Sequence, residues 1–205
     1  MKRAIFASIT IFMAAAVPAS ANYLLLTPTG TTLTTAQFRA EAAISPGGNN
    51  GEYYWLGTGL MQVEVNVLQR NPRAADKQSR LGAQWNFLPE TSLTPAVGFG
   101  VIDVTSASPE GIAGYVAITK HFAVPKSLSL VSDFAATAGL GAHGINGFFG
   151  SFEAHFAYGL FAEGEYDSRD FNGAVGWQPI KMLRFKAYSI KDEVFYGAEI
   201  PPISF

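Results

Sequence analysis

Residues 158–167 read YGLFAEGEYD, a short apolar and aromatic stretch that carries Glu163 and Glu165 two positions apart. Side chains alternate between two faces along a β-strand, so Leu160 and Ala162 share one face while both glutamates share the other. This spacing predicts a strand with one apolar face and one charged face. If the strand crosses a membrane, the glutamates must face the interior, because a charged side chain in hydrocarbon costs up to a few kcal/mol at mid-depth.

The same two-residue period recurs through most of the chain. In residues 34–44, for example, Phe38 and Ala40 alternate with Arg39 and Glu41, which is typical of a strand with one apolar face. We expect twelve strands, near 34–45, 52–57, 60–69, 79–88, 93–105, 111–123, 128–140, 147–157, 160–167, 172–178, 183–190 and 193–200. The strand at 52–57 is the weakest of these, and a count of ten strands is the alternative.

The expected connections between these strands are of two kinds. Tight turns are predicted at 58–59, 89–92, 124–127, 158–159 and 179–182, and they alternate with longer or more polar loops. An even number of strands, with both chain ends on the tight-turn side, is typical of bacterial outer-membrane barrels. The fold class is therefore predicted to be all-β: a closed antiparallel up-and-down transmembrane β-barrel.

The N-terminus has the pattern of a secretory signal peptide. Lys2 and Arg3 precede an apolar run of 14 residues from Ala4 to Val17, which is followed by the small residues 19–21. That run is shorter than the roughly 20 residues of a spanning helix. We expect cleavage after Ala21, leaving residues 22–33 as an N-terminal periplasmic segment and 34–205 as the barrel domain.

Composition supports export to a membrane. The chain has 13% aromatic and only 15% charged residues, whereas a soluble domain averages about 25% charged residues. Without the leader, 12 basic residues stand against 16 acidic ones, and a net charge of -4 argues against nucleic acid as a partner. The chain has no cysteine, so disulfide-stapled folds are excluded. No apolar run after residue 21 could form a spanning helix, which leaves a closed barrel as the way to cross a bilayer.

The strand alternation predicts which polar side chains line the lumen. The candidates are Arg39, Glu41, Gln62, Glu64, Asn66, Arg80, Gln84, Asn86, Glu153, His155, Glu163, Glu165, Arg184 and Lys186. Arg39, Arg80, Arg184 and Lys186 are the candidate partners of the two glutamates, and the sequence leaves the pairing open.

The overall pattern resembles the bacterial outer-membrane β-barrel proteins over residues 34–200. Proteins of that class often end in an aromatic residue that the barrel-assembly machinery reads, and this chain ends in Phe205. Pro201 and Pro202 are expected to stop the last strand near Ile200. The opening LLLTPTG at 24–30 and the closing residues 162–200 are also similar to barrels of the YjbH type, which implies polysaccharide as a partner and a role in its secretion.

Two chemical motifs are considered and set aside. The sequence GLGAHG at 139–144 fits a dinucleotide-binding pattern, but a strand and not a helix is expected to follow it, so no nucleotide cofactor is predicted. His121, His143 and His155 have no metal-ligand spacing, so neither a metal nor any other cofactor is expected. His155 with Glu153 and Ser151 is the one cluster that suggests catalysis, and the expectation is that the protein is not an enzyme.

Three functions therefore compete. The first is an outer-membrane barrel with a narrow or plugged pore and a structural, transport or secretion-accessory role, surrounded by outer-membrane lipid. The second is a barrel-embedded lipid-modifying enzyme. The third is a soluble exported β-sandwich adhesin, which needs outer faces more charged than this chain provides. Barrels of about 8 strands are filled by side chains and those of 16 to 18 hold a channel, so for the first function twelve strands predict a narrow or plugged pore.

Overall fold

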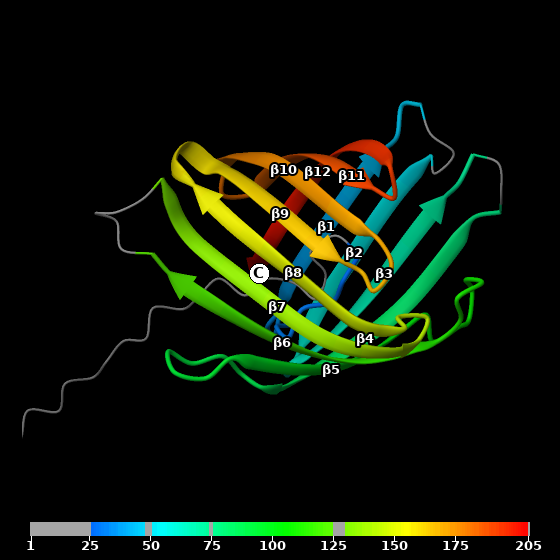
Figure 1. Ribbon diagram of the computed structural model, residues 1–205, viewed down its shortest axis with the longest axis horizontal. Coiled ribbons are helices and arrows are strands. Elements are labelled where there is room, and N and C mark those ends of the chain that lie inside the picture. The colour runs from blue at the N-terminus through cyan, green and yellow to red at the C-terminus, as the bar shows by residue number, and fades with distance from the viewer. Residues whose placement is uncertain (1–25, 48–50, 74–75, 125–129, 205) are drawn as a thin grey trace, which may run out of the picture.

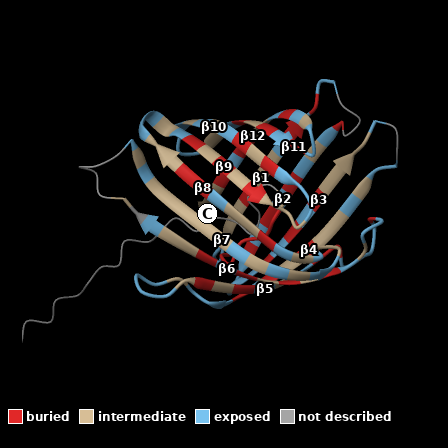
Figure 2. Ribbon diagram, in the orientation of Figure 1, coloured by how far each residue is buried: buried red, intermediate tan, exposed pale blue. Residues whose placement is uncertain are grey.

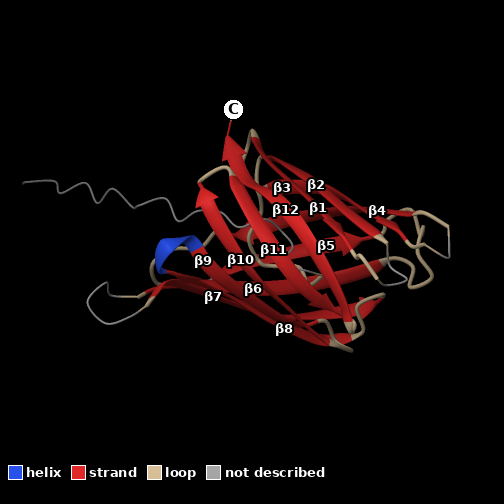
Figure 3. Ribbon diagram, turned by 90° about the horizontal axis from the view of Figure 1, so that it is seen from above, coloured by secondary structure: helices blue, strands red, loops and turns tan. Residues whose placement is uncertain are grey.

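The computed structural model describes residues 26–47, 51–73, 76–124 and 130–204. Its strands are β1 (Gln37–Ile44), β2 (Glu52–Leu60), β3 (Val63–Asn71), β4 (Gln78–Leu88), β5 (Ala96–Ile102), β6 (Ala113–Ala123), β7 (Val131–His143), β8 (Gly147–Phe156), β9 (Leu160–Tyr166), β10 (Phe171–Ile180), β11 (Leu183–Ile190) and β12 (Glu193–Ser204). One turn of 3₁₀ helix, η1 (Ala157–Gly159), lies between β8 and β9 (Figure 3). Among the described residues, no helix is long and apolar enough to cross a bilayer.

The strands form a closed antiparallel barrel (Figure 1). Each strand pairs with the next along the chain, and β1 closes the sheet by pairing with β12, with Ile44 opposite Tyr196 and Gln37 opposite Ser204. The predicted twelve-strand barrel is confirmed, and the alternative of ten strands is wrong. The predicted leader at 1–21 and the terminal Phe205 lie outside the described residues.

The two ends of the barrel differ less than the sequence predicted. We call the end where β1 begins and β12 ends the terminal end, and the opposite end the far end. The terminal end carries connections 61–62, 89–95, 124–130, 157–159 and 181–182, and the far end carries 45–51, 72–77, 103–112, 144–146, 167–170 and 191–192. The tight turn expected at 89–92 is wrong, because β5 begins three residues later than predicted, and the turn expected at 124–127 lies largely outside the described residues. Loop length therefore does not distinguish the two ends.

The position predicted for the turn between β2 and β3 is also wrong. It lies at Met61 and Gln62, both with positive φ (49° and 67°), and not at 58–59. A two-residue hairpin turn of this kind needs positive φ at both central positions, which usually selects glycine or asparagine. Gly59 lies instead inside β2, where an added Cβ would approach the backbone oxygen of Leu33 to 2.2 Å. The glycine therefore allows the segment before β1 to pack closely against the wall.

The last strand continues through two prolines. Pro201 and Pro202 were expected to end it near Ile200, but β12 extends to Ser204. Phe38 pairs with Ile203 and Ala40 pairs with Ile200, so both prolines lie in a bulge opposite a single residue of β1. Proline is tolerated at a bulge because the residue there donates no ladder hydrogen bond.

Buried and exposed residues alternate along the strands (Figure 2). The outward face is apolar, with exposed side chains such as Leu56, Val65 and Val175. Among outward-facing strand positions only Glu52, at the far end, and Lys120, near the terminal end, carry charge. The Lys120 ammonium turns back toward the connection 89–95, where it lies 2.6 Å from the oxygen of Thr91. The remaining strand charges point into the barrel.

Candidate functional site

The lumen holds the chain that precedes β1. Residues 26–33, which we call the lumenal segment, run from the far end toward the terminal end inside the wall, and all but Leu26 are buried. Of the segment 22–33, which was predicted from the sequence to be periplasmic, residues 26–33 therefore lie inside the barrel, and residues 22–25 lie outside the described part. The sequence here is LTPTGTTL, whose small and polar residues suit a polar lumen.

Glu165 holds the far-end portion of the lumenal segment. Its carboxylate accepts hydrogen bonds from the backbone N–H of Leu26 at 3.0 Å and of Thr27 at 2.9 Å, and from the Thr27 hydroxyl at 2.9 Å. The Asn172 amide donates a further bond at 3.0 Å. Of the two glutamates that stood out in the sequence, this one therefore binds backbone and not a cation. A hydrogen bond to a charged group is stronger than a neutral one.

The middle of the lumenal segment is held by β4 and β6. The Gly30 N–H donates to the Thr119 hydroxyl at 2.7 Å, while the amides of Gln84 and Asn86 donate to the oxygens of Thr31 and Gly30 at 2.9 and 2.7 Å. These contacts satisfy backbone groups that a buried chain cannot leave without partners.

The terminal-end portion is held by Glu64 of β3, whose carboxylate accepts the N–H of Leu33 at 2.9 Å. Each of these hydrogen bonds joins a side chain of the wall to the segment. The segment can thus separate from the wall without breaking the ladder bonds that close the barrel.

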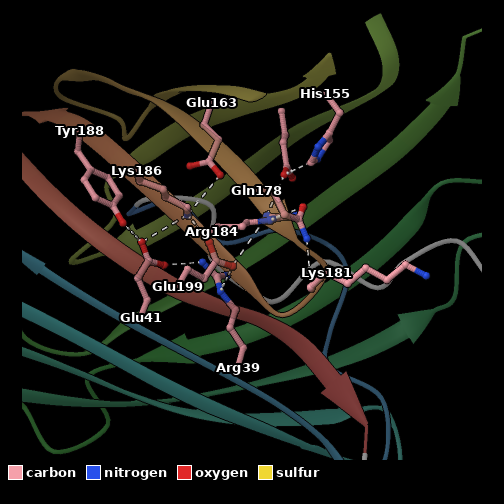
Figure 4. Close-up of polar contacts among 11 residues, drawn as sticks. Arg39, Glu41, His155, Glu163, Gln178, Lys181, Arg184, Lys186, Tyr188 and Glu199 are labelled. Carbon is pink, nitrogen blue, oxygen red and sulfur yellow. Dashed lines mark hydrogen bonds and ion pairs between the residues drawn. The ribbon is translucent and has the colours of Figure 1, made fainter. Parts of the chain in front are cut away.

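The opposite side of the lumen is filled by ion pairs between β1, β9, β11 and β12 (Figure 4). Lys186 has a completely buried side chain, and its ammonium lies 2.6 Å from Glu199, 3.3 Å from Glu163 and 3.4 Å from Glu41. Arg39 lies 2.9 Å from Glu199 and 2.7 Å from Glu41. Tyr188 donates its hydroxyl to Glu41.

The ion pairs continue toward the terminal end along β8 and β11. The guanidinium of Arg184 lies 3.3 Å from Glu153, and Nε2 of His155 lies 2.7 Å from the same carboxylate oxygen. Arg184 also hydrogen-bonds Gln178 of β10 at 3.2 Å. We call the connected set the lumenal ion cluster: Arg39, Glu41, Glu153, His155, Glu163, Arg184, Lys186 and Glu199. It contains four carboxylates, three permanent cations and one histidine.

The fourteen residues expected to line the lumen divide into four groups. Seven of them belong to the ion cluster, namely Arg39, Glu41, Glu153, His155, Glu163, Arg184 and Lys186. Glu64, Gln84, Asn86 and Glu165 contact the lumenal segment, and Asn66 is a buried neighbour that bonds Glu64 at 3.3 Å. Arg80 lies at the far-end mouth, where it pairs with Glu110 at 2.8 Å. Gln62 does not line the lumen, because it is exposed in the turn between β2 and β3.

Sequence reasoning missed several members of these sites. Glu199 pairs with all three permanent cations of the cluster, and Thr119 binds Gly30. The alternation of β12, in which Val194, Tyr196 and Ile200 face outward, was a usable signal for Glu199. Nothing in one sequence indicates that Thr119 would meet a segment 89 residues away.

The geometry gives no support to a serine-based catalytic cluster. Ser151 and His155 are four residues apart on β8, which places their backbones about 13 Å apart at the usual strand rise. The described polar contacts of His155 are to Glu153 and, through its backbone oxygen, to Ser132. No group of three His, Cys, Asp or Glu side chains within the described ranges could hold a metal ion.

Comparisons with known proteins find little. No protein family and no curated protein matches the chain, so no match supports the similarity to YjbH barrels. One similar solved structure comes from a study called "Unveiling the Mechanism Behind the in-meso Crystallization of Membrane Proteins". It covers 82% of this chain and 84% of its own, with 13% identity and a TM-score of 0.47. A likeness of this size identifies neither a family nor a function.

Proposed function

We propose that the protein is an outer-membrane β-barrel that forms a plugged conduit, closed at rest by its own lumenal segment. The observation that carries this proposal is the outward surface of the wall, which is largely apolar and, among the described strand residues, has charge only at Glu52 and Lys120 near its two ends. Soluble monomers rarely expose a contiguous apolar patch beyond a few hundred Å², because such a surface associates or aggregates. A bilayer is the environment that suits a closed apolar belt.

The aromatic residues support a membrane orientation for this belt. Trp85, Phe87 and Trp177 are exposed toward the terminal end, while Tyr54 and Tyr196 are exposed toward the far end. Membrane barrels carry such aromatic girdles at both bilayer interfaces, where amphipathic rings meet the headgroups. A soluble β-sandwich adhesin does not account for this arrangement.

The contents of the lumen support a plug and not a permanent filling. The lumenal segment belongs to none of the twelve strands and is held mainly by separate side-chain hydrogen bonds, while Leu33 at its terminal end packs in a buried apolar cluster with Trp55 and Tyr115. Behind it lies a polar wall of Glu64, Gln84 and Asn86. Once these bonds are released, the lumen on this side would offer a hydrophilic path.

This function implies particular surroundings. We propose that the leader at 1–21 exports the chain, that the barrel-assembly machinery inserts it, and that outer-membrane lipid surrounds it. The role of the conduit is then transport or assistance in secretion, with polysaccharide as the candidate cargo.

Fractionation and conductance test the two parts of this proposal. The protein should be recovered with outer membranes and should change gel mobility between unheated and boiled samples. In planar bilayers the intact protein should show no steady conductance, whereas a variant lacking residues 22–33 should conduct once its heat-dependent mobility shows that it folds. Recovery as a soluble periplasmic protein would rule out the membrane location, and a folded but silent deletion variant would rule out the plug.

A further inference from the structure

A recess opens at the far end, above the lumenal segment. Leu26 and Thr27 form its floor, and its walls come from β2 to β6 and from the far-end connections 103–112, 144–146, 167–170 and 191–192. The recess is therefore inside the ring of strands. Lipid around the barrel cannot enter it, whereas a solute from the far side can.

Four cationic side chains line this recess: Arg70 of β3, Arg80 of β4, Arg169 of the connection 167–170 and Lys191 of the connection 191–192. They come from four separate segments that converge only in the closed barrel. The guanidinium of Arg70 lies over the ring of Tyr53 at 5.6 Å, so an aromatic wall adjoins the cations.

The carboxylates in the same recess are already engaged. Asp103 accepts bonds from the hydroxyl and N–H of Ser108 at 2.5 and 2.8 Å and from the N–H of Ala107 at 2.8 Å. Asp167 accepts the N–H groups of Arg169 and Asp170 at 3.1 and 2.8 Å. These contacts order the two loops, and Glu110, the third carboxylate that lines the recess, forms an ion pair with Arg80.

The cations are only partly neutralised as a result. Arg80 pairs with Glu110 at 2.8 Å, yet its Nε is buried without a hydrogen-bond partner. Within the described residues, no carboxylate oxygen lies within 4.0 Å of the Arg169 guanidinium or the Lys191 ammonium. Cationic side chains that converge on a concave site, two of them solvent-exposed and beyond ion-pair distance of a carboxylate, are an arrangement that binds carboxylate or phosphate groups.

We propose that the recess binds a solute carrying an oxyanion, such as a sugar with a carboxylate or phosphate group. The planar guanidinium groups would donate paired hydrogen bonds to the oxyanion, Lys191 would add a point charge, and the Tyr53 wall would contact the body of the solute. The bound solute would rest on Leu26 and Thr27. This site is independent of the proposed conduit, because solute binding needs neither a bilayer nor a pore.

Three sugars that differ only at carbon 6 test the site. The protein in nonionic detergent is titrated calorimetrically, at fixed ionic strength, with glucose, glucuronate and glucose 6-phosphate. Glucuronate and glucose 6-phosphate should bind at least about tenfold more tightly than glucose, since loss of a charge-assisted bond has an effect of that size. Equal affinity for glucose and glucuronate would overturn the proposal.

Two variants locate the binding. Arg169→Gln and Lys191→Gln should each weaken glucuronate binding about tenfold or more. Lys77→Gln is the matched control, because Lys77 is an exposed far-end cation that does not line the recess. Heat-dependent mobility confirms that each variant is folded. If Lys77→Gln weakens binding as much as the other two, the anion is attracted by the general surface charge and the recess is not the site.

Discussion

Removal of the Glu165 carboxylate is the most direct perturbation of the lumenal segment. Three donors of the segment, the N–H groups of Leu26 and Thr27 and the Thr27 hydroxyl, converge on this carboxylate within 3.0 Å. Hydrogen bonds to a charged group contribute about 1.5–3 kcal/mol each. Glu165→Ala removes all three, and water at the nearby mouth can replace part of the loss. If two bonds are lost at about 1.5 kcal/mol each, the bound state of the segment is destabilised by about 3 kcal/mol. This corresponds to about a 150-fold rise in the ratio of released to bound segment.

A cysteine probe measures this ratio. The chain has no cysteine, so a Thr29→Cys variant carries a single thiol, in the buried part of the lumenal segment. A water-soluble thiol reagent should reach this thiol only when the segment leaves the wall. Its labelling rate should then rise about 150-fold on adding Glu165→Ala if release is fast compared with labelling.

Glu163→Gln serves as the matched control in the same background. Glu163 is on the same strand and face, two residues away, but its ion pair is with Lys186 and not with the lumenal segment. Its labelling rate should stay within a few-fold of the parent. If both variants raise labelling equally, then loss of lumenal charge loosens the whole barrel and Glu165 is not a specific anchor. If Glu165→Ala leaves labelling unchanged, the hydrogen bonds at this residue do not hold the segment.

Three further outcomes are expected. Lys186→Met removes a cation from the buried carboxylates around it and should lower the free energy of unfolding in vesicles by about 3–5 kcal/mol. Lys191→Met is the control, because Lys191 is exposed, and it should change the free energy of unfolding little. Equal effects of the two substitutions would mean that the cluster is solvated. Ala162→Arg puts a charge on the outward face and should lower the free energy of unfolding in vesicles by about 2–4 kcal/mol if that face meets lipid. A decrease of less than about 0.5 kcal/mol would instead indicate an ordinary water-exposed surface. Burial works to raise the pKa of Asp103, but hydrogen bonds from Ser108 and Ala107 outweigh it, so this pKa lies below its usual value. The ionised carboxylate should therefore stabilise loop 103–112 at pH values above the pKa that Asp103 has in the unfolded chain. This stabilisation should be lost as the pH falls through the lower pKa of the folded protein. Amide exchange at Ala107 and Ser108, corrected for the intrinsic rate, should show this loss on acidification in the parent and not in Asp103→Asn.

Strand number and face could be predicted because they depend on local alternation. A charge on the outward face is penalised wherever it occurs, so the parity of Glu163 and Glu165 already placed both glutamates inside. The predicted strand boundaries were wrong where the local sequence signal conflicted with tertiary packing. Gly59 resembled a turn residue but serves close contact with Leu33, and Met61 and Gln62 form a turn without typical turn residues.

The site was less predictable than the fold because its contacts join distant parts of the chain. Glu165 and Thr27 are 138 residues apart, and the bond between them depends on the closed barrel and not on any local pattern. The lumenal segment has no strand or helix periodicity, so one sequence gave no reason to place it inside. The partner of Glu163 was undecided for the same reason, since several cations shared its parity.

The width of a twelve-strand barrel explains why the lumen needs two different fillings. Side chains alone fill a barrel of about 8 strands, so twelve leave a gap. Long side chains of the ion cluster close it beside β9, β11, β12 and β1. Across the lumen, several inward residues of β5 and β6 are small, including Ala96, Gly98 and Ala117, and they leave room for a backbone. Gly30 uses that room, because a Cβ there would lie 2.9 Å from the oxygens of Ala96 and Ala117. The small inward residues of these middle strands therefore mark the part of the wall that accommodates the segment, and larger side chains there would displace it.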